Sequence, residues 1–238
     1  MVPTTVREAL ADQPVSGAVC LEAGAGVGNT TEGLLAAGAE RVYAVTNDPE
    51  HARTTRERVA DDPRAAVCEA DLRATPLPDD SIEVVTAHGL CNVLTPAALD
   101  AVVDELTRVA APGARLVVDD YDPLPPDARM REVVAVENAA HALADAEDAL
   151  TFYPASHLRR LLAGAGWTFE RETTLLDPVP WTTTHVRAHL GAARAATERL
   201  PDDVGVGLRG RIDQLDADLE REDAGRMYSL AFRLPAVA

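Results

Sequence analysis

The sequence contains no lysine, so all 22 basic residues are arginine, and 39 aspartates and glutamates give a formal net charge of −17. Binding to nucleic-acid phosphates usually requires a basic patch, so this balance disfavours a nucleic-acid partner. An acidic surface also stays hydrated and self-repelling, and high salt screens that repulsion. The net charge therefore indicates the salt conditions that suit the protein, and it does not indicate which reaction the protein carries out.

This composition is typical of halophilic archaeal proteins. A GC-rich genome, which favours arginine over lysine and enriches alanine, is the alternative explanation. In a salt-adapted protein the argument against nucleic acid is weaker, because the whole surface is biased towards acid.

Only three cysteines occur, Cys20, Cys68 and Cys91, and they lie far apart with no CxxC spacing. They therefore predict neither a zinc site nor a disulfide framework, and we expect no metal. Cys20 and Cys68 stand in apolar, strand-like runs and are expected to be small core residues. Aromatic residues make up only 4% of the chain, so the core must be built mainly from alanine, valine and leucine.

Long apolar runs are also absent. No stretch approaches the roughly 18 apolar residues that a membrane span needs. Residues 1–8 lack the charged head and apolar run of a secretory signal. We therefore expect a cytoplasmic protein without a membrane partner. Its 238 residues suit a single domain over 1–238, with an elaboration.

Short apolar runs alternate with segments of helical periodicity along most of the chain. Strands are predicted at 18–21, 41–46, 64–70, 82–87, 114–118, 167–174 and 228–234, and helices at 4–12, 29–37, 49–60, 96–111, 128–146 and 155–163. Short buried runs between helices indicate a mostly parallel sheet with helices on both faces. The predicted fold class is therefore α/β, with a doubly wound, seven-stranded, mostly parallel sheet.

About fifty residues separate the last two predicted strands and contain two predicted helices, at 182–199 and 204–221. This helical insertion, taken as 177–223, departs from a plain hairpin, as does the helix at 128–146. Two roles are open for it: a lid over a ligand site, or a homodimer surface.

The first predicted strand runs into the sequence VCLEAGAGVGN, in which Glu22 precedes a Gly-x-Gly-x-Gly motif at Gly24, Gly26 and Gly28. Glycines let the backbone turn sharply and approach a ligand without interference from a Cβ atom. The helix that follows offers unpaired N–H groups at its start. In an α/β sheet, this carboxyl end of the first strand borders the expected ligand crevice.

The glycine motif resembles motif I of the class I S-adenosylmethionine-dependent methyltransferases, whereas a nicotinamide-binding protein would normally show GxGxxG. Four further segments resemble elements of that family, in the same order: 69–72, 77–85, 106–114 and 161–167. The resemblance covers about 15–175 and the last strand. It implies a Rossmann-like methyltransferase fold with S-adenosylmethionine as cofactor.

The resemblance also implies the cofactor-binding residues. These are Glu22, Gly24, Ala25, Gly26 and Gly28 at the motif, Thr46, Asn47 and Asp48 after the second strand, Asp71 and Leu72 after the third, and His88 after the fourth. Family members usually hold both ribose hydroxyls with an acidic residue at the position of Thr46. Asn47 or Asp48 is the alternative here, and Asp71 corresponds to the residue that bonds the adenine amino group.

His88, Asp119 and Tyr121 are the candidate catalytic residues, because they follow the fourth and fifth strands on the expected ligand side. His88 could be a general base or a substrate hydrogen-bond partner, and a locally satisfied histidine is the alternative. Asp119, together with Asp120, could orient an amine or help bind a metal. In a chain with 39 acidic residues, chance placement competes with that role.

Two further sets of residues carry weaker signals. His185 and His189 have the i, i+4 spacing of half a metal site, but no third ligand accompanies them, so a solvated helix is favoured. Trp181 and Tyr153 either line a substrate pocket or pack in the core.

The predicted function is methyl transfer from S-adenosylmethionine to a small-molecule acceptor. Residues 87–92 lack the Asn/Asp-Pro-Pro-Tyr-like motif of enzymes that methylate exocyclic amino groups of nucleic acids. A protein substrate is one alternative. A non-catalytic scaffold or regulatory protein is another, because of Thr46. An NAD-dependent oxidoreductase is the third, because Asp48 lies near the ribose-binding offset of a Rossmann fingerprint.

Overall fold

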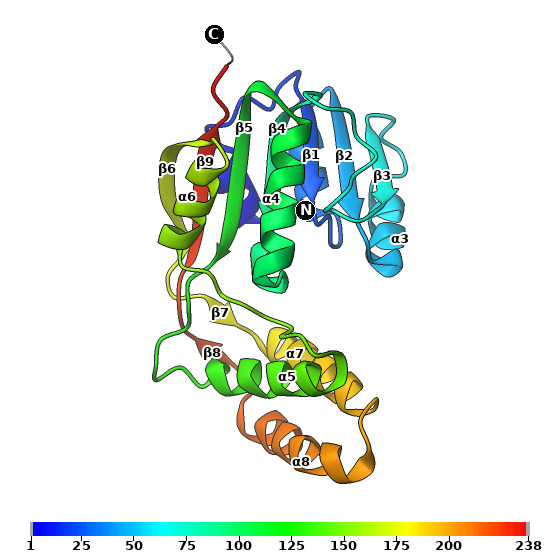
Figure 1. Ribbon diagram of the computed structural model, residues 1–238, viewed down its shortest axis with the longest axis vertical. Coiled ribbons are helices and arrows are strands. Elements are labelled where there is room, and N and C mark those ends of the chain that lie inside the picture. Colours follow the sequence, from blue (N-terminus) through cyan, green and yellow to red (C-terminus); the bar gives the residue numbers. More distant parts are fainter. Residues whose placement is uncertain (1, 237–238) are drawn as a thin grey trace.

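A computed structural model describes residues 2–236. Its strands are β1 (Val19–Ala23), β2 (Arg41–Thr46), β3 (Ala65–Glu69), β4 (Ile82–His88), β5 (Ala110–Tyr121), β6 (Thr168–Leu176), β7 (Pro180–Trp181), β8 (Glu222–Asp223) and β9 (Met227–Arg233). The helices are α1 (Thr4–Leu10), α2 (Asn29–Ala36), α3 (Pro49–Arg58), the 3-10 helix η1 (Cys91–Val93), α4 (Pro96–Val109), α5 (Met130–Asp145), α6 (Ala155–Gly164), α7 (Thr183–Thr197) and α8 (Asp202–Asp218). Figure 1 shows a sheet-based upper part and a helical lower part.

The seven-stranded sheet has the order β3-β2-β1-β4-β5-β9-β6. Its first five strands pair in parallel, and β9 runs antiparallel between β5 and β6. This arrangement confirms the predicted α/β class and the mostly parallel sheet. In β4 the residues from Val84 to Ala87 are all buried, as expected for a central strand with helices on both faces.

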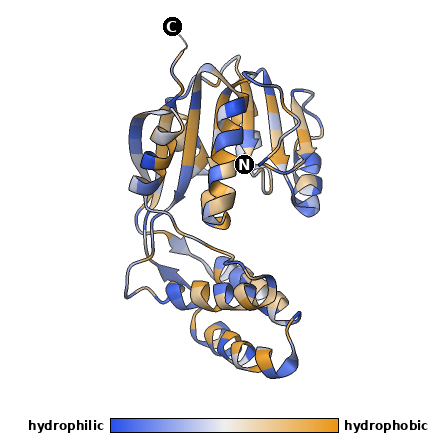
Figure 2. Ribbon diagram, viewed as in Figure 1, coloured by the Kyte–Doolittle hydropathy of each residue, from blue (hydrophilic) through white to orange (hydrophobic). Residues whose placement is uncertain are grey.

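The two faces of the sheet bury different clusters of apolar side chains. On one face, α4 packs through Leu99, Val102, Val103 and Leu106. On the other, α1 and α2 cover Cys20, which is fully buried, as predicted. Cys68, on the edge strand β3, is only partly buried. Figure 2 shows apolar residues along the central strands of the upper part.

Strand β5 is longer than the sequence pattern predicted, because it includes three polar residues after Val118. They remain in the ladder because β9 pairs with them: Asp119 lies opposite Ser229, Asp120 opposite Tyr228, and Tyr121 opposite Met227. Both aspartates are buried as a result. The extension carries polar side chains to the carboxyl edge of the sheet, where the parallel strands β1 to β4 also end.

Two segments that lie far apart in the sequence build the helical lower part of Figure 1. Helix α5 follows β5, whereas α7 and α8 lie between β6 and β9. Val133 of α5, Leu190 of α7 and Ile212 of α8 belong to one buried cluster. A short pairing of β7 with β8, which the sequence pattern did not predict, joins the two ends of the insertion. The predicted insertion 177–223 therefore shares its core with α5.

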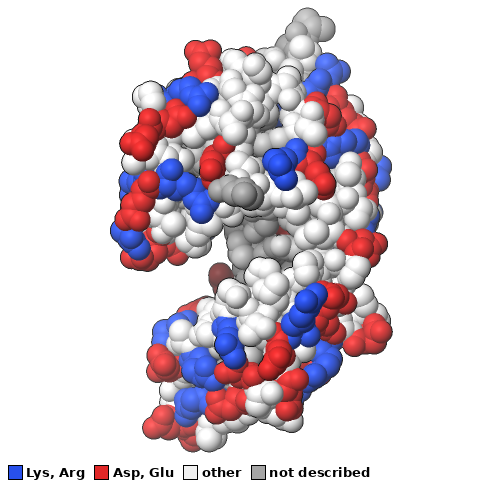
Figure 3. All heavy atoms as spheres, turned by 180° about the vertical axis from the view of Figure 1, so that it is seen from behind, with Lys and Arg blue, Asp and Glu red and all other residues white. Residues whose placement is uncertain are grey.

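Arginine and acidic side chains are interspersed over the face shown in Figure 3. Arg226, for example, pairs with both Asp122 and Glu172. Within residues 2–236, every helix is too short or too polar to cross a bilayer.

Candidate functional site

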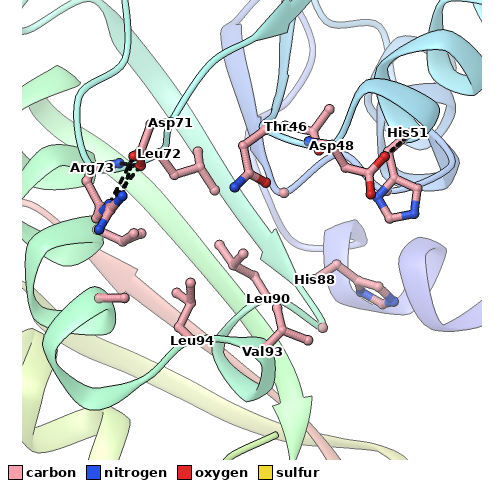
Figure 4. A pocket seen from close by; sticks show the side chains of 16 residues that line it. Thr46, Asp48, His51, Asp71, Leu72, Arg73, His88, Leu90, Val93 and Leu94 are labelled. Atoms are coloured by element: carbon pink, nitrogen blue, oxygen red, sulfur yellow. Dashed lines mark hydrogen bonds and ion pairs between the residues drawn. The ribbon is translucent and has the colours of Figure 1, made fainter. Parts of the chain in front are cut away.

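A cavity of about 520 Å³ opens at the carboxyl ends of the parallel strands. That volume lies in the range of roughly 300–1,000 Å³ that is typical of small-molecule sites. Eight of the predicted cofactor-binding residues line it: Gly24, Gly26, Thr46, Asn47, Asp48, Asp71, Leu72 and His88 (Figure 4). Open α/β sheets bind ligands at such a place, where connections leave neighbouring strands in opposite directions.

The glycine motif forms the turn after β1. Gly24 and Gly26 have positive φ angles of 76° and 48°, a region that L side chains rarely adopt. A Cβ atom on Gly24 would lie 2.8 Å from Cδ1 of Leu90, whereas a Cβ on Gly26 would lie 3.9 Å from the carbonyl oxygen of Gly24. A side chain at Gly26 would therefore extend into open space beside the cavity.

Two other predicted residues of the motif support the turn from behind the cavity wall. Ala25 is buried, and its N–H donates to the carbonyl of Val45 at 2.9 Å. Gly28 caps α2 with a φ of 78° and packs closely on Thr55, whose Cγ2 would lie 3.0 Å from an added Cβ.

Glu22 is buried beneath the turn and does not line the cavity. The hydroxyl of Thr31, in α2, donates a hydrogen bond to its carboxylate. Burial raises the pKa of Glu22 to about 7, although this hydrogen bond and the charge of His88 oppose the shift. A carboxyl group with this pKa changes its charge near neutral pH directly below the glycine turn.

The three candidate ribose-binding residues differ in how they are engaged. The hydroxyl of Thr46 accepts from the backbone N–H of Asp48 at 3.2 Å. Asp48 caps α3, and its Oδ1 accepts from the N–H groups of Glu50 and His51 at 2.8 and 2.9 Å. Asn47 is exposed, and within residues 2–236 its side chain makes no hydrogen bond. Its whole side chain is free to bind a ligand, whereas Asp48 keeps only Oδ2 free.

Asp71 and Leu72 form the opposite wall of the cavity. Arg73 holds the Asp71 carboxylate with a two-pronged contact in which Nη2 lies 2.6 Å from Oδ2, as Figure 4 shows. The hydrogen bond from Arg73 lowers the pKa of Asp71. Leu72 is buried and gives this wall an apolar surface.

His88 and Asp119 form a hydrogen-bonded pair at the carboxyl ends of β4 and β5. Nδ1 of His88 lies 2.9 Å from Oδ2 of Asp119. Burial alone would lower the pKa of His88, but the hydrogen bond and charge of Asp119, with the charges of Glu22 and Asp120, outweigh it and raise the pKa. The other carboxylate oxygen, Oδ1 of Asp119, is buried and has no hydrogen-bond partner within residues 2–236.

Tyr121, the third candidate catalytic residue, lines a second and smaller cavity of about 190 Å³ instead. Trp181 lines the same cavity and also belongs to the buried cluster of the helical part, so its position agrees with both of the roles left open for it. Tyr153 packs in the core beside α4 and donates from its hydroxyl to the carbonyl of Leu94 at 2.9 Å.

His185 and His189 also lie at the second cavity, and they do not form a metal site with a third ligand. Nδ1 of His189 is 2.8 Å from Oε2 of Glu137, which is buried. Among the described residues, no group of three His, Cys, Asp or Glu side chains is placed to hold a metal ion.

Several lining residues of the large cavity were not predicted. The loop after β4 contributes Gly89, Leu90, Val93 and Leu94, α4 contributes Ala98 and Val102, the first turn of α3 contributes His51, and the turn after β3 contributes Arg73. Leu90 and Leu94 lie on either side of η1, and their apolar spacing was the available signal. It resembles that of core residues, so the sequence alone did not single them out.

Comparison with known proteins agrees with this geometry. Residues 20–113 match a family described as "Methyltransferase domain". This matched segment contains the glycine turn and most of the parallel strands. A stretch of 113 residues, 47% of this chain, is 36% identical to the demethylmenaquinone methyltransferase of Clavibacter sepedonicus. The match spans 44% of that relative's length.

Solved structures share the fold of the whole chain around the methyltransferase domain. A candidate methyltransferase from Bacillus halodurans matches 98% of this chain and 100% of its own, with a TM-score of 0.67 at 14% identity. Geranyl diphosphate C-methyltransferase from Streptomyces coelicolor A3(2), solved with Mg²⁺, geranyl diphosphate and S-adenosylhomocysteine, matches 96% of this chain and 79% of its own. Its TM-score is 0.62 at 14% identity. The predicted fold is confirmed, residues 20–113 match the predicted family, and the nicotinamide alternative gains no support.

Replacing Glu22 by Gln should change how stability depends on pH. A free glutamate loses its proton near 4.5, whereas folded Glu22 keeps it to about pH 7. The folded state therefore binds more protons in this window, and stability falls as pH rises through it. We expect the ionisation of Glu22 to lower the free energy of unfolding by on the order of 3 kcal/mol between pH 4 and 8. The variant should lack that loss, because glutamine does not ionise. Its side-chain oxygen can still accept the hydrogen bond from Thr31.

Urea unfolding of both proteins at a series of pH values measures this difference. The stability of Glu22→Gln relative to the original protein should rise with pH. A difference that stays constant from pH 4 to 8 would contradict the burial argument.

Proposed function

We propose that the chain transfers a methyl group from S-adenosylmethionine to a small-molecule acceptor. The observation that carries this proposal is the cavity beside the glycine turn, within the segment that matches the methyltransferase family. When bound, S-adenosylmethionine supplies an activated methyl group on its sulfonium. The protein then acts mainly by holding an acceptor in line with that group and by excluding water.

The residues that line the cavity suit this cofactor. The turn at Gly24 and Gly26 leaves the backbone open to a ligand. Asn47 is assigned to the ribose hydroxyls, because Thr46 and Asp48 are engaged in the turn and the capping of α3. Leu72 offers an apolar surface to a flat base. An acidic residue at the position of Thr46 is therefore not needed in this chain.

His88 is assigned as the general base, and Asp119 as the residue that positions it. A hydrogen bond from Nδ1–H to the Asp119 carboxylate fixes the neutral ring with its lone pair on Nε2. The ring lines the cavity and is about a quarter exposed. Nε2 is thus the atom that accepts a proton from an acceptor beside the methyl donor.

The shape of the molecule favours a small acceptor. In Figure 3 a deep notch separates the sheet-based part from the helical part, and in Figure 1 the parallel strands point across it towards the helices. We assign the unit of α5, α7 and α8 as a lid over this notch. The small-molecule enzyme geranyl diphosphate methyltransferase shares the fold.

Calorimetric titration with S-adenosylmethionine, S-adenosylhomocysteine and NAD tests the cofactor assignment. We expect the first two to bind and NAD not to bind. Gly26→Arg should abolish binding, because its side chain would enter the space beside the cavity. Gly113→Arg is the matched control: Gly113 also has a positive φ, of 90°, and an added Cβ there meets nothing within 4 Å.

Equal loss in both glycine variants would point to general damage rather than to a blocked site. Binding of NAD alone would overturn the proposal. No binding of any of the three by the folded protein would make the scaffold alternative the better account.

The role of Asp119 can be tested without knowing the acceptor. Asp119→Asn should lower the pKa of His88, because the carboxylate charge and its hydrogen bond raise it. The pKa is measured by NMR titration of the imidazole C–H signals, with His88→Gln used to assign the His88 signal among the six histidines. An unchanged His88 pKa in Asp119→Asn would contradict the assigned pairing.

A further inference from the structure

Three aromatic side chains from distant segments converge on the second cavity. Tyr121 lies at the end of β5, Phe152 precedes α6, and Trp181 belongs to β7. The ring centroids of Tyr121 and Trp181 are 5.3 Å apart, those of Tyr121 and Phe152 6.2 Å, and those of Phe152 and Trp181 6.3 Å. The chain has only two Trp, four Tyr and three Phe, so a third of its aromatic residues meet here.

The charges around this aromatic pocket are negative. Asp120, with 1% exposure, lies behind Tyr121, and Glu137, with 5% exposure, is held by His189 on the pocket wall. None of the residues that line the pocket is an arginine, although the chain has 22 basic residues. Aromatic faces and buried carboxylates attract a cation, and the only lining side chains that can carry a positive charge are His185 and His189, of which His189 is paired with Glu137.

The aromatic pocket and the large cavity share a wall. In the loop after β4, Leu90 and Val93 line the large cavity while Asn92 lines the aromatic pocket. Asn92 is fixed there because its Nδ2 donates to Oδ1 of Asp120 at 2.9 Å. On β5, Tyr121 lies two residues beyond Asp119, so both side chains face the same side of the sheet. His88 lines the large cavity, and its partner Asp119 lies on the strand that ends at Tyr121 of the aromatic pocket.

We propose that the aromatic pocket is the acceptor site of the proposed methyltransferase, and that it takes a small aliphatic amine. Methylation increases the positive charge on such a nitrogen, and aromatic faces stabilise a charged, alkylated nitrogen more than an uncharged group of the same shape. Oδ1 of Asp119, buried and without a hydrogen-bond partner among residues 2–236, is an unused acceptor two residues from Tyr121 on β5. This assignment rests on the proposed function and names its substrate class.

A primary or secondary amine would react as the neutral nitrogen. The lone pair of the neutral nitrogen forms a bond to the methyl carbon, while the carbon–sulfur bond breaks and its electron pair stays on sulfur as a thioether. The nitrogen then carries one positive charge and loses its proton to Nε2 of His88. A tertiary amine would keep the charge as a quaternary ammonium ion and would need no base.

Binding of choline, compared with its uncharged isostere 3,3-dimethylbutan-1-ol, tests the assignment directly and without the methyl donor. The Trp167→Phe background leaves Trp181 as the sole tryptophan, so its fluorescence reports on the pocket. At constant ionic strength we expect choline to bind at least tenfold more tightly than the isostere. Tyr121→Leu should weaken choline binding at least tenfold, whereas Tyr121→Phe, which keeps the ring, should retain it.

The same variants are titrated with S-adenosylhomocysteine by calorimetry. Unchanged binding of this ligand to Tyr121→Leu, together with loss of choline, would support a separate acceptor pocket in a folded protein. Equal affinity for choline and its isostere, or no effect of Tyr121→Leu, would overturn the amine assignment while leaving the proposed function standing. Binding of choline without any binding of S-adenosylhomocysteine would overturn both.

Discussion

The parallel pairing of β1 with both β2 and β4 is the constraint on which the rest of the structure depends. It places Glu22 opposite Ala44 on one side and opposite Thr86 on the other. The turns that follow these strands must then meet at one edge, and together they form the large cavity. The next pairing, of β4 with β5, puts His88 opposite Asp119. Strand register, rather than loop conformation, therefore sets the geometry of the proposed base.

The helical part depends on that sheet in turn. Its core combines α5 with α7 and α8, so neither of the two inserted segments buries its apolar face without the other. The aromatic pocket forms at the base of this unit, from the end of β5, the segment before α6 and β7. Three of the chain's few aromatic residues lie at this junction. Aromatic side chains such as Tyr228 and Phe232 are also buried in the sheet core, but at this junction the three rings line a cavity, which fits recognition of a ligand.

Local patterns in the sequence predicted the fold and much of the large cavity. Buried apolar runs between helices predicted the parallel sheet, and the spacing of Gly24 and Gly26 predicted the turn. Strand register and tertiary packing bring His88 to Asp119 and Tyr121 to Trp181. No short sequence pattern contains that information. The end of β5 was missed for the same reason, since its polar residues are held in the sheet by β9. Leu90 was missed because a cavity wall and a core have the same apolar character.

The most direct test of the account is a crystal structure of the protein with S-adenosylhomocysteine bound. The account predicts the ligand in the large cavity, with its base against Leu72, its ribose at Asn47, and its sulfur facing the pair of His88 and Asp119 and the aromatic pocket beyond. A ligand bound elsewhere, or bound in the reverse direction with its sulfur beside Asp71, would contradict it.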